Sequence, residues 1–138
     1  MVVIILGVET HGYIVAAKLT PKIPAREHRL LYEAVVDCYD EVERAMGWYY
    51  YLERTVVFPF KAKCQSAVNT SPLALGEIVC VVSLADEEDC MSEVLVNVEY
   101  RSGTVSVPLA QLVCVTQEKS TLLAVGDWHY WVARGYTY

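Results

Sequence analysis

The chain has 138 residues, a length typical of one domain, and 54% of them are hydrophobic, which is enough to form a packed core. Its formal net charge of −6 disfavours a general nucleic-acid binder and docking to an anionic membrane surface, since both need basic residues. An acidic balance suits a cation ligand or a basic partner, and it also suits ordinary solubility.

The N-terminal segment is the most apolar part of the chain. Met1–Val8 is too short for a membrane span and lacks the preceding charged region of a signal peptide, which predicts a cytoplasmic protein. We expect residues 1–26 to form an N-terminal extension, either loosely attached or added as a strand at a sheet edge. Residues 27–138 are expected to form a single domain.

A helical pattern follows from about Glu27 to Leu52. Its apolar residues recur at three- and four-residue steps and predict one buried stripe, made of Leu31, Val35, Cys38, Val42, Ala45, Tyr49 and Leu52. Gly47 interrupts the pattern before the aromatic run Trp48–Tyr51, so we expect the helix to bend or break there.

After Arg54 the pattern changes to short strands. Pro59 places the first strand, Thr55–Phe60, at an edge or makes it start at the proline. A continuous apolar run predicts a buried strand, and a clean alternation predicts a second one with Val94, Val96, Val98 and Tyr100 on one face. The remaining segments, in chain order, are the buried strand 77–84, the alternating strand 93–100, a tight hairpin at 101–103, a strand at 104–107, and 109–115 as a strand or as a 3₁₀ turn followed by a strand.

The tail after Lys119 is expected to form a last strand and then a short helix. Asp127 is the predicted N-cap of that helix, and Gly135 the residue that follows its C-terminus. The predicted fold is therefore α+β: a small SH3-like β-barrel with one N-terminal helix and a short C-terminal helix.

Four consecutive acids form the strongest candidate site. Calcium takes six to eight oxygen ligands, and a loop of adjacent carboxylates can supply several of them. A solvated charged turn explains the same pattern. The EF-hand template does not fit, because its sixth position would be Met91 instead of glycine. The candidate ligands are Asp86, Glu87, Glu88 and Asp89.

A second acidic group lies on the predicted helix. Asp37, Asp40 and Glu41 are spaced at i, i+3 and i+4, so they share one face and are candidate metal ligands. Arg44 at the next step could neutralise part of this group, which favours a structural ion pair or a solvated face.

Other chemistry has little support in the sequence. The five cysteines are odd in number and contain no CxxC spacing, which speaks against a disulfide framework and a zinc site and favours buried thiols. The histidines His11, His28 and His129 do not pair at metal-ligand spacing. No nucleophile motif or glycine-rich phosphate loop is present, so we do not expect an enzyme.

The aromatic clusters allow an alternative function. Trp48–Tyr51 and Trp128–Trp131 could line a peptide-binding groove, as in SH3-like interaction modules. They could equally pack the helices against the strands, because a small chain needs large rings for its core. Burial of Trp48 and Trp128 would favour packing.

Several strings of residues, taken together, carry a family resemblance. They are residues 43–52, 58–60 with Ala62 and Cys64, 71–73, 76–77, 107–109, 111–112, 127–131 and 135–136. This set resembles the CcbP-like family of cyanobacterial-type calcium-binding proteins, over roughly Glu33 to Tyr138. The resemblance implies a small intracellular protein that binds and buffers Ca²⁺ through acidic surface residues without an EF-hand. By chemistry, the acids named above are the best candidates for its ligands, and no protein partner can be assigned.

Overall fold

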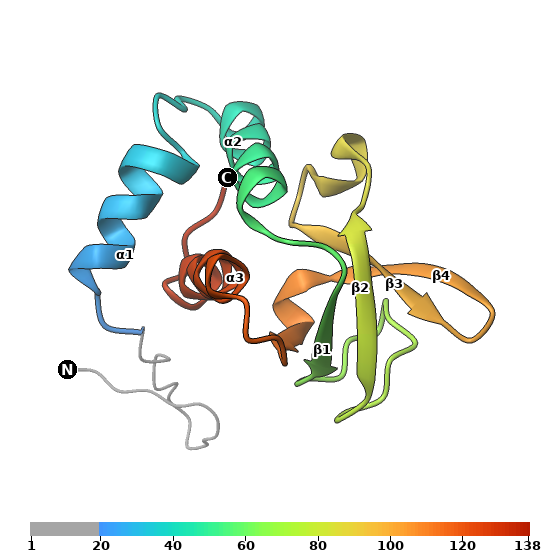
Figure 1. Cartoon of the computed structure of the whole chain (residues 1–138). Coiled ribbons are helices and arrows are strands. Elements are labelled where there is room, and N and C mark those ends of the chain that lie inside the picture. Colours follow the sequence, from blue (N-terminus) through green and yellow to red (C-terminus); the bar gives the residue numbers. More distant parts are fainter. Residues whose placement is uncertain (1–19) are drawn as a thin grey trace, which may run out of the picture.

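The computed structural model describes residues 20–138, so residues 1–19, which include His11 and most of the expected extension, lie outside the described part. Figure 1 shows three helices gathered on one side of a twisted sheet. The elements are α1 (Pro24–Arg29), the π-helical turn η1 (Leu30–Ala34), α2 (Glu41–Thr55), β1 (Phe60–Cys64), β2 (Ile78–Leu84), the 3₁₀ turn η2 (Glu87–Cys90), β3 (Leu95–Tyr100), β4 (Gly103–Pro108), the 3₁₀ turn η3 (Leu109–Gln111), β5 (Leu112–Cys114) and α3 (Lys119–Ala133).

The five strands form one antiparallel sheet in the order β4-β3-β2-β1-β5. The α+β class is confirmed, but the sheet is open: β4 and β5 lie at opposite ends, and within residues 20–138 they are not paired with each other. The predicted closed SH3-like barrel is therefore not confirmed. The short β5 pairs with Ala62–Cys64 of β1 along one edge, and its other edge has no strand partner among residues 20–138.

The strand predictions are largely confirmed. Val94, Val96 and Val98 are buried on one face as their alternation indicated, and the hairpin turns at Arg101, which has a positive φ of 56°. The segment 109–115 is a 3₁₀ turn followed by a strand. The predicted first strand, Thr55–Phe60, is wrong in its bounds, because α2 continues to Thr55 and β1 begins at Phe60, directly after Pro59. This strand also lies inside the sheet, between β2 and β5, and not at an edge.

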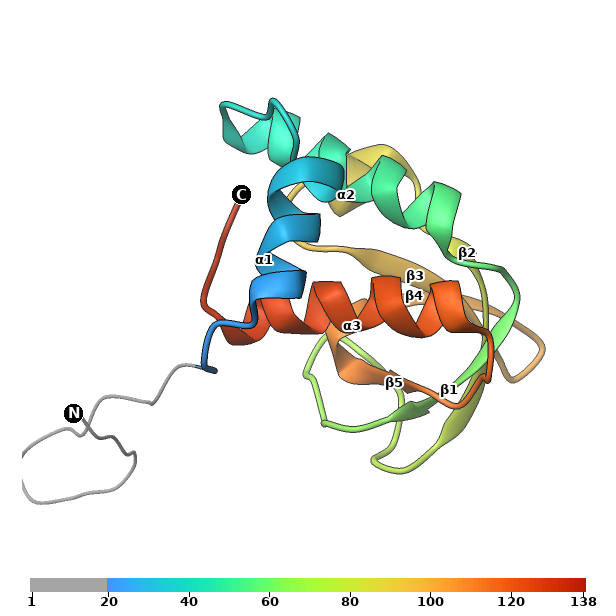
Figure 2. The same ribbon diagram turned by 60° about the vertical axis from the view of Figure 1, so that its left-hand side comes forward.

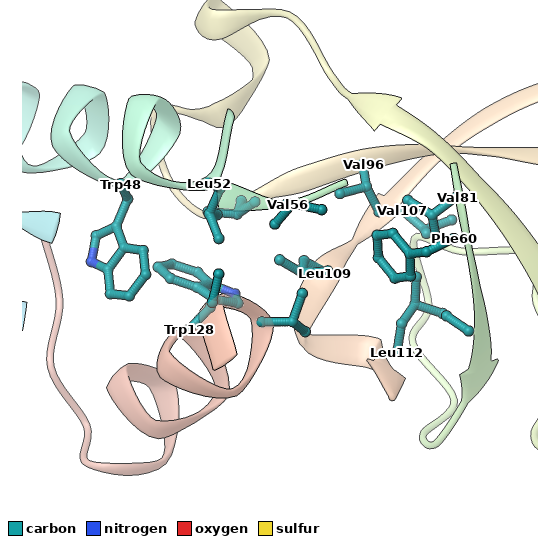
Figure 3. Packing of buried hydrophobic residues seen from close by; sticks show 14 of the residues in the cluster. Trp48, Leu52, Val56, Phe60, Val81, Val96, Val107, Leu109, Leu112 and Trp128 are labelled. Atoms are coloured by element: carbon teal, nitrogen blue, oxygen red, sulfur yellow. The ribbon is translucent and has the colours of Figure 1, made fainter. Parts of the chain in front are cut away.

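The core lies between the helices and the concave face of the sheet. Figure 3 shows Trp48 and Leu52 of α2 meeting Trp128 of α3, with the valines of the sheet beyond them. Trp48 is fully buried and Trp128 is 3% exposed, and their rings pack edge to face 5.0 Å apart. These rings therefore pack helix against helix, which favours the packing interpretation over a peptide-binding groove formed by Trp48 and Trp128.

The predicted helix from Glu27 to Leu52 is wrong in its continuity. The chain breaks after η1, where Asp37 has a positive φ of 56° and Asp40 starts α2 as its N-cap. Gly47 does not bend the helix. A Cβ at this position would lie 2.6 Å from the Ala34 carbonyl oxygen, so glycine lets α2 pack against η1. Because of the break, Leu31 and Val42 of the expected stripe are 58% and 57% exposed.

The predicted strand after Lys119 and the short final helix are replaced by one helix. Glu118 is the N-cap of α3, with its carboxylate accepting a hydrogen bond from the Thr121 amide at 2.7 Å. Asp127 is not an N-cap but lies in the middle of this helix. Gly135 follows the helix with a φ of 77°, as expected. Among residues 20–138, no helix has the length and apolar character needed to cross a membrane.

Candidate metal centre

The helix acids lie where the chain enters α2. The Asp40 carboxylate accepts a hydrogen bond from the Glu43 amide at 2.8 Å, and the Glu43 carboxylate accepts one from the Tyr39 amide at 2.7 Å. This reciprocal capping box occupies one oxygen of Asp40. Asp37 and Glu41 are exposed beside it. The helix group thus has a structural task and keeps its remaining carboxylate oxygens facing solvent.

Arg44 does not pair with the helix acids. Its Nε donates to the Tyr138 backbone oxygen at 2.7 Å, and its Nη2 donates to the same oxygen. Within residues 20–138, neither acidic group forms an ion pair with a Lys, Arg or His side chain. The expected neutralisation by Arg44 is therefore not seen.

The four acids Asp86–Asp89 lie between β2 and β3, in and directly before the 3₁₀ turn η2, and all four are exposed. The turn is held from below by Ala85 and Cys90, which are buried against Tyr49 of α2. The Tyr49 hydroxyl donates a hydrogen bond to the Ala85 carbonyl at 2.8 Å. A rigid base therefore presents a row of carboxylates to solvent.

Two tyrosines of α2, Tyr49 and Tyr50, lie beside the acidic turn and have raised pKa values. Burial, together with smaller effects from Cys90, Glu53, Glu87 and Asp86, raises the pKa of Tyr49 to about 12. The Tyr50 hydroxyl donates to the Glu87 carboxylate, and this hydrogen bond raises the pKa of Tyr50. Glu53 was missed by the sequence analysis. Its position one helical turn after Tyr49 and Tyr50 becomes informative only when η2 is placed beside α2.

The two acidic groups are separate. The turn contacts α2 at Tyr49 and Tyr50, and Asp40 precedes Tyr49 by nine residues, about 14 Å along the helix axis. Calcium ligands lie roughly 2.3–2.6 Å from the ion, so one ion shared by the two groups would need their side chains to come together across this stretch of the helix. In the part of the chain from Thr20 onward, no three or more His, Cys, Asp or Glu side chains are already gathered around a common point. Any coordination shell must therefore form as the carboxylates turn toward the ion.

Asp127 is a buried carboxylate with hydrogen bonds to both of its oxygens. It is completely buried and accepts hydrogen bonds from Arg26 at 2.6 Å, from Arg29 at 2.8 and 2.9 Å, and from Tyr51 at 2.7 Å. Hydrogen bonding to Asp127 raises the pKa of Arg29, and burial together with the same carboxylate raises the pKa of Tyr51. The sequence analysis missed this cluster. The signal that could have found it is the three-residue spacing of Arg26 and Arg29, which places them on one helix face. With its charge compensated, Asp127 has no free oxygen for a metal.

The cysteines and the described histidines have structural surroundings. All five cysteines are free; Cys64 and Cys90 are buried and the other three are partly buried. His129 has a ring nitrogen 2.6 Å from the Leu112 carbonyl oxygen, and burial lowers its pKa, so its role is in packing and hydrogen bonding. His28 stacks against Tyr32 with ring centroids 4.6 Å apart. None of these residues adds a ligand to either acidic group.

Comparison with known proteins relates the chain to a family. A model of the Calci_bind_CcbP family, described as calcium binding, matches residues 28–132. The crystal structure of Anabaena CcbP is 33% identical, with a TM-score of 0.77, over 86% of this chain and 98% of that one. A calcium-binding protein solved in its calcium-binding form is 34% identical, with a TM-score of 0.75, over 85% and 96% of the two chains. No curated protein matches the sequence. The fold, the matched length and these identities place the chain in the CcbP family of calcium-binding proteins.

Proposed function

We propose that this protein binds Ca²⁺ chiefly through the acidic turn Asp86–Asp89, in a manner unrelated to an EF-hand. The observation that carries the proposal is a row of four exposed carboxylates on a buried base, without a basic partner in the described residues, in a member of a calcium-binding family. Left empty, such a row repels itself, and a divalent cation relieves the repulsion.

The chemistry of the turn fits calcium better than other metals. Carboxylate oxygens are hard ligands, which calcium prefers, while zinc and copper favour the sulfur and nitrogen ligands that are lacking here. The surrounding backbone carbonyls and water can complete a shell of six to eight oxygens. Magnesium demands a stricter octahedron and gives up its water reluctantly, so an exposed, adjustable turn favours calcium.

The helix acids form a second, weaker candidate group. Asp37, Asp40 and Glu41 supply free oxygens, but Asp40 already caps α2 and the three side chains do not converge on one point. Affinity at both groups is limited by the cost of ordering exposed side chains, which suits a protein that buffers calcium. We assign it neither catalytic chemistry nor a nucleic-acid or membrane partner, in keeping with the net charge of −6.

Calorimetric titration of the full chain with calcium, with magnesium as competitor, tests the proposal. Asp86→Asn with Asp89→Asn should weaken calcium binding by about tenfold or more, at least as much as the loss of a supporting residue at a metal site. Asp40→Asn should weaken it less, because Asn keeps the helix cap while removing one charge.

A matched charge control separates a site from general electrostatics. Glu33→Gln with Glu99→Gln also removes two exposed negative charges, outside both acidic groups, and should change the calcium affinity less than twofold. Equal losses in the two double variants would reduce the turn to a contribution to overall charge. The absence of any binding heat at millimolar calcium would refute the proposal altogether.

A further inference from the structure

The corner formed by η1, the connection that follows it and the first residues of α2 exposes several large apolar side chains. Figure 2 shows this corner, residues 30–42, projecting from the top of the molecule beyond the ends of α1 and α2. Five of the twelve residues from 31 to 42 are large apolar or aromatic side chains that are 45–80% exposed. They are Leu31, Tyr32, Val36, Tyr39 and Val42. Concentrated exposure of this kind is typical of a surface that meets another molecule.

A groove lies next to this corner and shares residues with it. It has a volume of about 310 Å³. Its lining residues are Leu30, Leu31, Val35, Trp131, Tyr136, Glu27 and His28. The volume is large enough for an apolar side chain from a partner. A pocket of this kind beside an exposed apolar surface is a usual position for the anchor residue of an interface.

The charge of the corner is of one sign. Residues 30–43 contain five acids and no lysine or arginine. Glu43 and Asp40 form the capping box, and Glu33, Asp37, Asp40 and Glu41 are exposed and alternate along the chain with the exposed apolar residues. The arginines next to the corner are already engaged: Arg29 pairs with Asp127, Arg54 donates to the Glu33 carbonyl at 3.0 Å, and Arg44 donates to the Tyr138 backbone oxygen. The corner is thus an apolar surface with an acidic border.

We propose that this corner docks a basic amphipathic segment of another protein. The apolar face of such a segment would cover Leu31, Tyr39 and Val42 and place one side chain in the groove, while its Lys and Arg residues meet the acidic border. Charge complementarity selects this occupant. An anionic membrane and an acidic peptide would be repelled by the border. A second copy would bring two acidic borders together.

A labelled 18-residue peptide of leucine and lysine, patterned as an amphipathic helix, is the probe, and its affinity for the full chain is measured by fluorescence anisotropy. Leu31→Ser with Tyr39→Ser should weaken binding by about tenfold or more, because exposed side chains at the centre of such a surface carry much of the affinity. Glu33→Gln with Asp37→Asn should weaken it several-fold and reduce its dependence on salt. Asn tolerates the positive φ at position 37.

Two control variants test whether the effects are specific to the corner. Leu122→Ser with Leu123→Ser removes two exposed apolar side chains on α3, and Glu87→Gln with Glu88→Gln removes two charges from the acidic turn; both should leave the peptide affinity within twofold. Equal effects of control and corner variants, equal binding of a leucine–glutamate peptide, or no binding would overturn the proposal. So would a dimer in sedimentation that Leu31→Ser converts to a monomer, since the corner would then be occupied by a second copy.

Discussion

Asp127 and the acidic turn Asp86–Asp89 carry negative charge in opposite environments, one buried and one exposed. Asp127 is completely buried, and two arginines and the Tyr51 hydroxyl compensate it. The four turn carboxylates are exposed and have the Tyr50 hydroxyl as their side-chain partner. A buried charge must be paired to be tolerated, whereas water stabilises an exposed one. The protein thus uses two of its arginines to join α1 to α3 and leaves the turn free for a cation.

Removing the buried charge should have the largest effect. Asp127→Asn leaves Arg26 and Arg29 facing a neutral group, which should lower the free energy of unfolding by about 3 kcal/mol. This value is at the lower end for a broken buried pair, because the two arginine side chains are 27% and 19% exposed. Urea unfolding followed by tryptophan fluorescence measures the change. A loss below about 1 kcal/mol would mean that the cluster does not hold the helices together.

The acidic turn should behave in the opposite way, with an effect that depends on calcium. At a calcium concentration of about 100 times Kd, binding to the folded state adds about 2.7 kcal/mol to the stability of the unaltered protein. Asp86→Asn with Asp89→Asn should lose most of this gain. Without calcium the same variant should differ by about 0.5 kcal/mol or less, since these residues are exposed.

Thermal unfolding with calcium and with a chelator distinguishes the two kinds of carboxylate. Asp127→Asn should be destabilised under both conditions by the same amount. A calcium-independent loss in the turn variant would assign the turn a structural role and contradict the comparison.

The helix acid Asp40 is intermediate, because it is exposed but makes a structural hydrogen bond. Asp40→Ala removes the N-cap of α2 and should lower the free energy of unfolding by about 1 kcal/mol. Asp40→Asn keeps an accepting oxygen and should cost only a few tenths of a kcal/mol. Urea unfolding in the absence of calcium measures both, and equal losses would show that the charge matters more than the cap.

The smallest expected effect is the titration of His129. Burial lowers its pKa below the ordinary value of 6.5, so the unfolded chain binds the proton more readily than the folded one. Its contribution to stability is therefore complete above pH 6.5 and is lost as the pH falls from 6.5 through the lowered folded-state pKa. His129→Gln should reduce the slope of stability against pH between 5 and 7, measured by urea unfolding. An unchanged slope would assign this region of the profile to other groups.

The sequence predicted the strands better than the helices. Alternation in residues 94–100 and the continuous apolar run ending at Leu84 are local patterns with one simple solution, and both strands are present. The helical spacing from Glu27 to Leu52 continued across a break, because the residues after Ala34 keep a three- and four-residue step while Asp37 and Asp40 end one helix and begin the next. Periodicity alone did not reveal that break.

The candidate site was predictable in its residues and not in its surroundings. Four adjacent acids are visible in any reading of the sequence, and so are the three acids of the helix group. Their relation depends on where α2 lies against η2, which puts Tyr50 and Glu53 beside the turn and Asp40 about 14 Å away along the helix. Asp127 was misassigned because a carboxylate before an aromatic run resembles an N-cap, and its arginine partners are about 100 residues distant.

By itself, the sequence determined the acidic character, the α+β class, the strand pattern, the candidate carboxylates and the resemblance to a calcium-binding family. These depend on composition and on short-range spacing, which a linear pattern records directly. The tertiary structure alone decided the open sheet, the break before α2, the burial of Trp48 and Trp128, and the division of the carboxylates into a buried, salt-bridged Asp127 and an exposed turn without an ion pair in residues 20–138. That division is set by which residues meet across long stretches of chain, because burial and pairing together fix the cost of a charge.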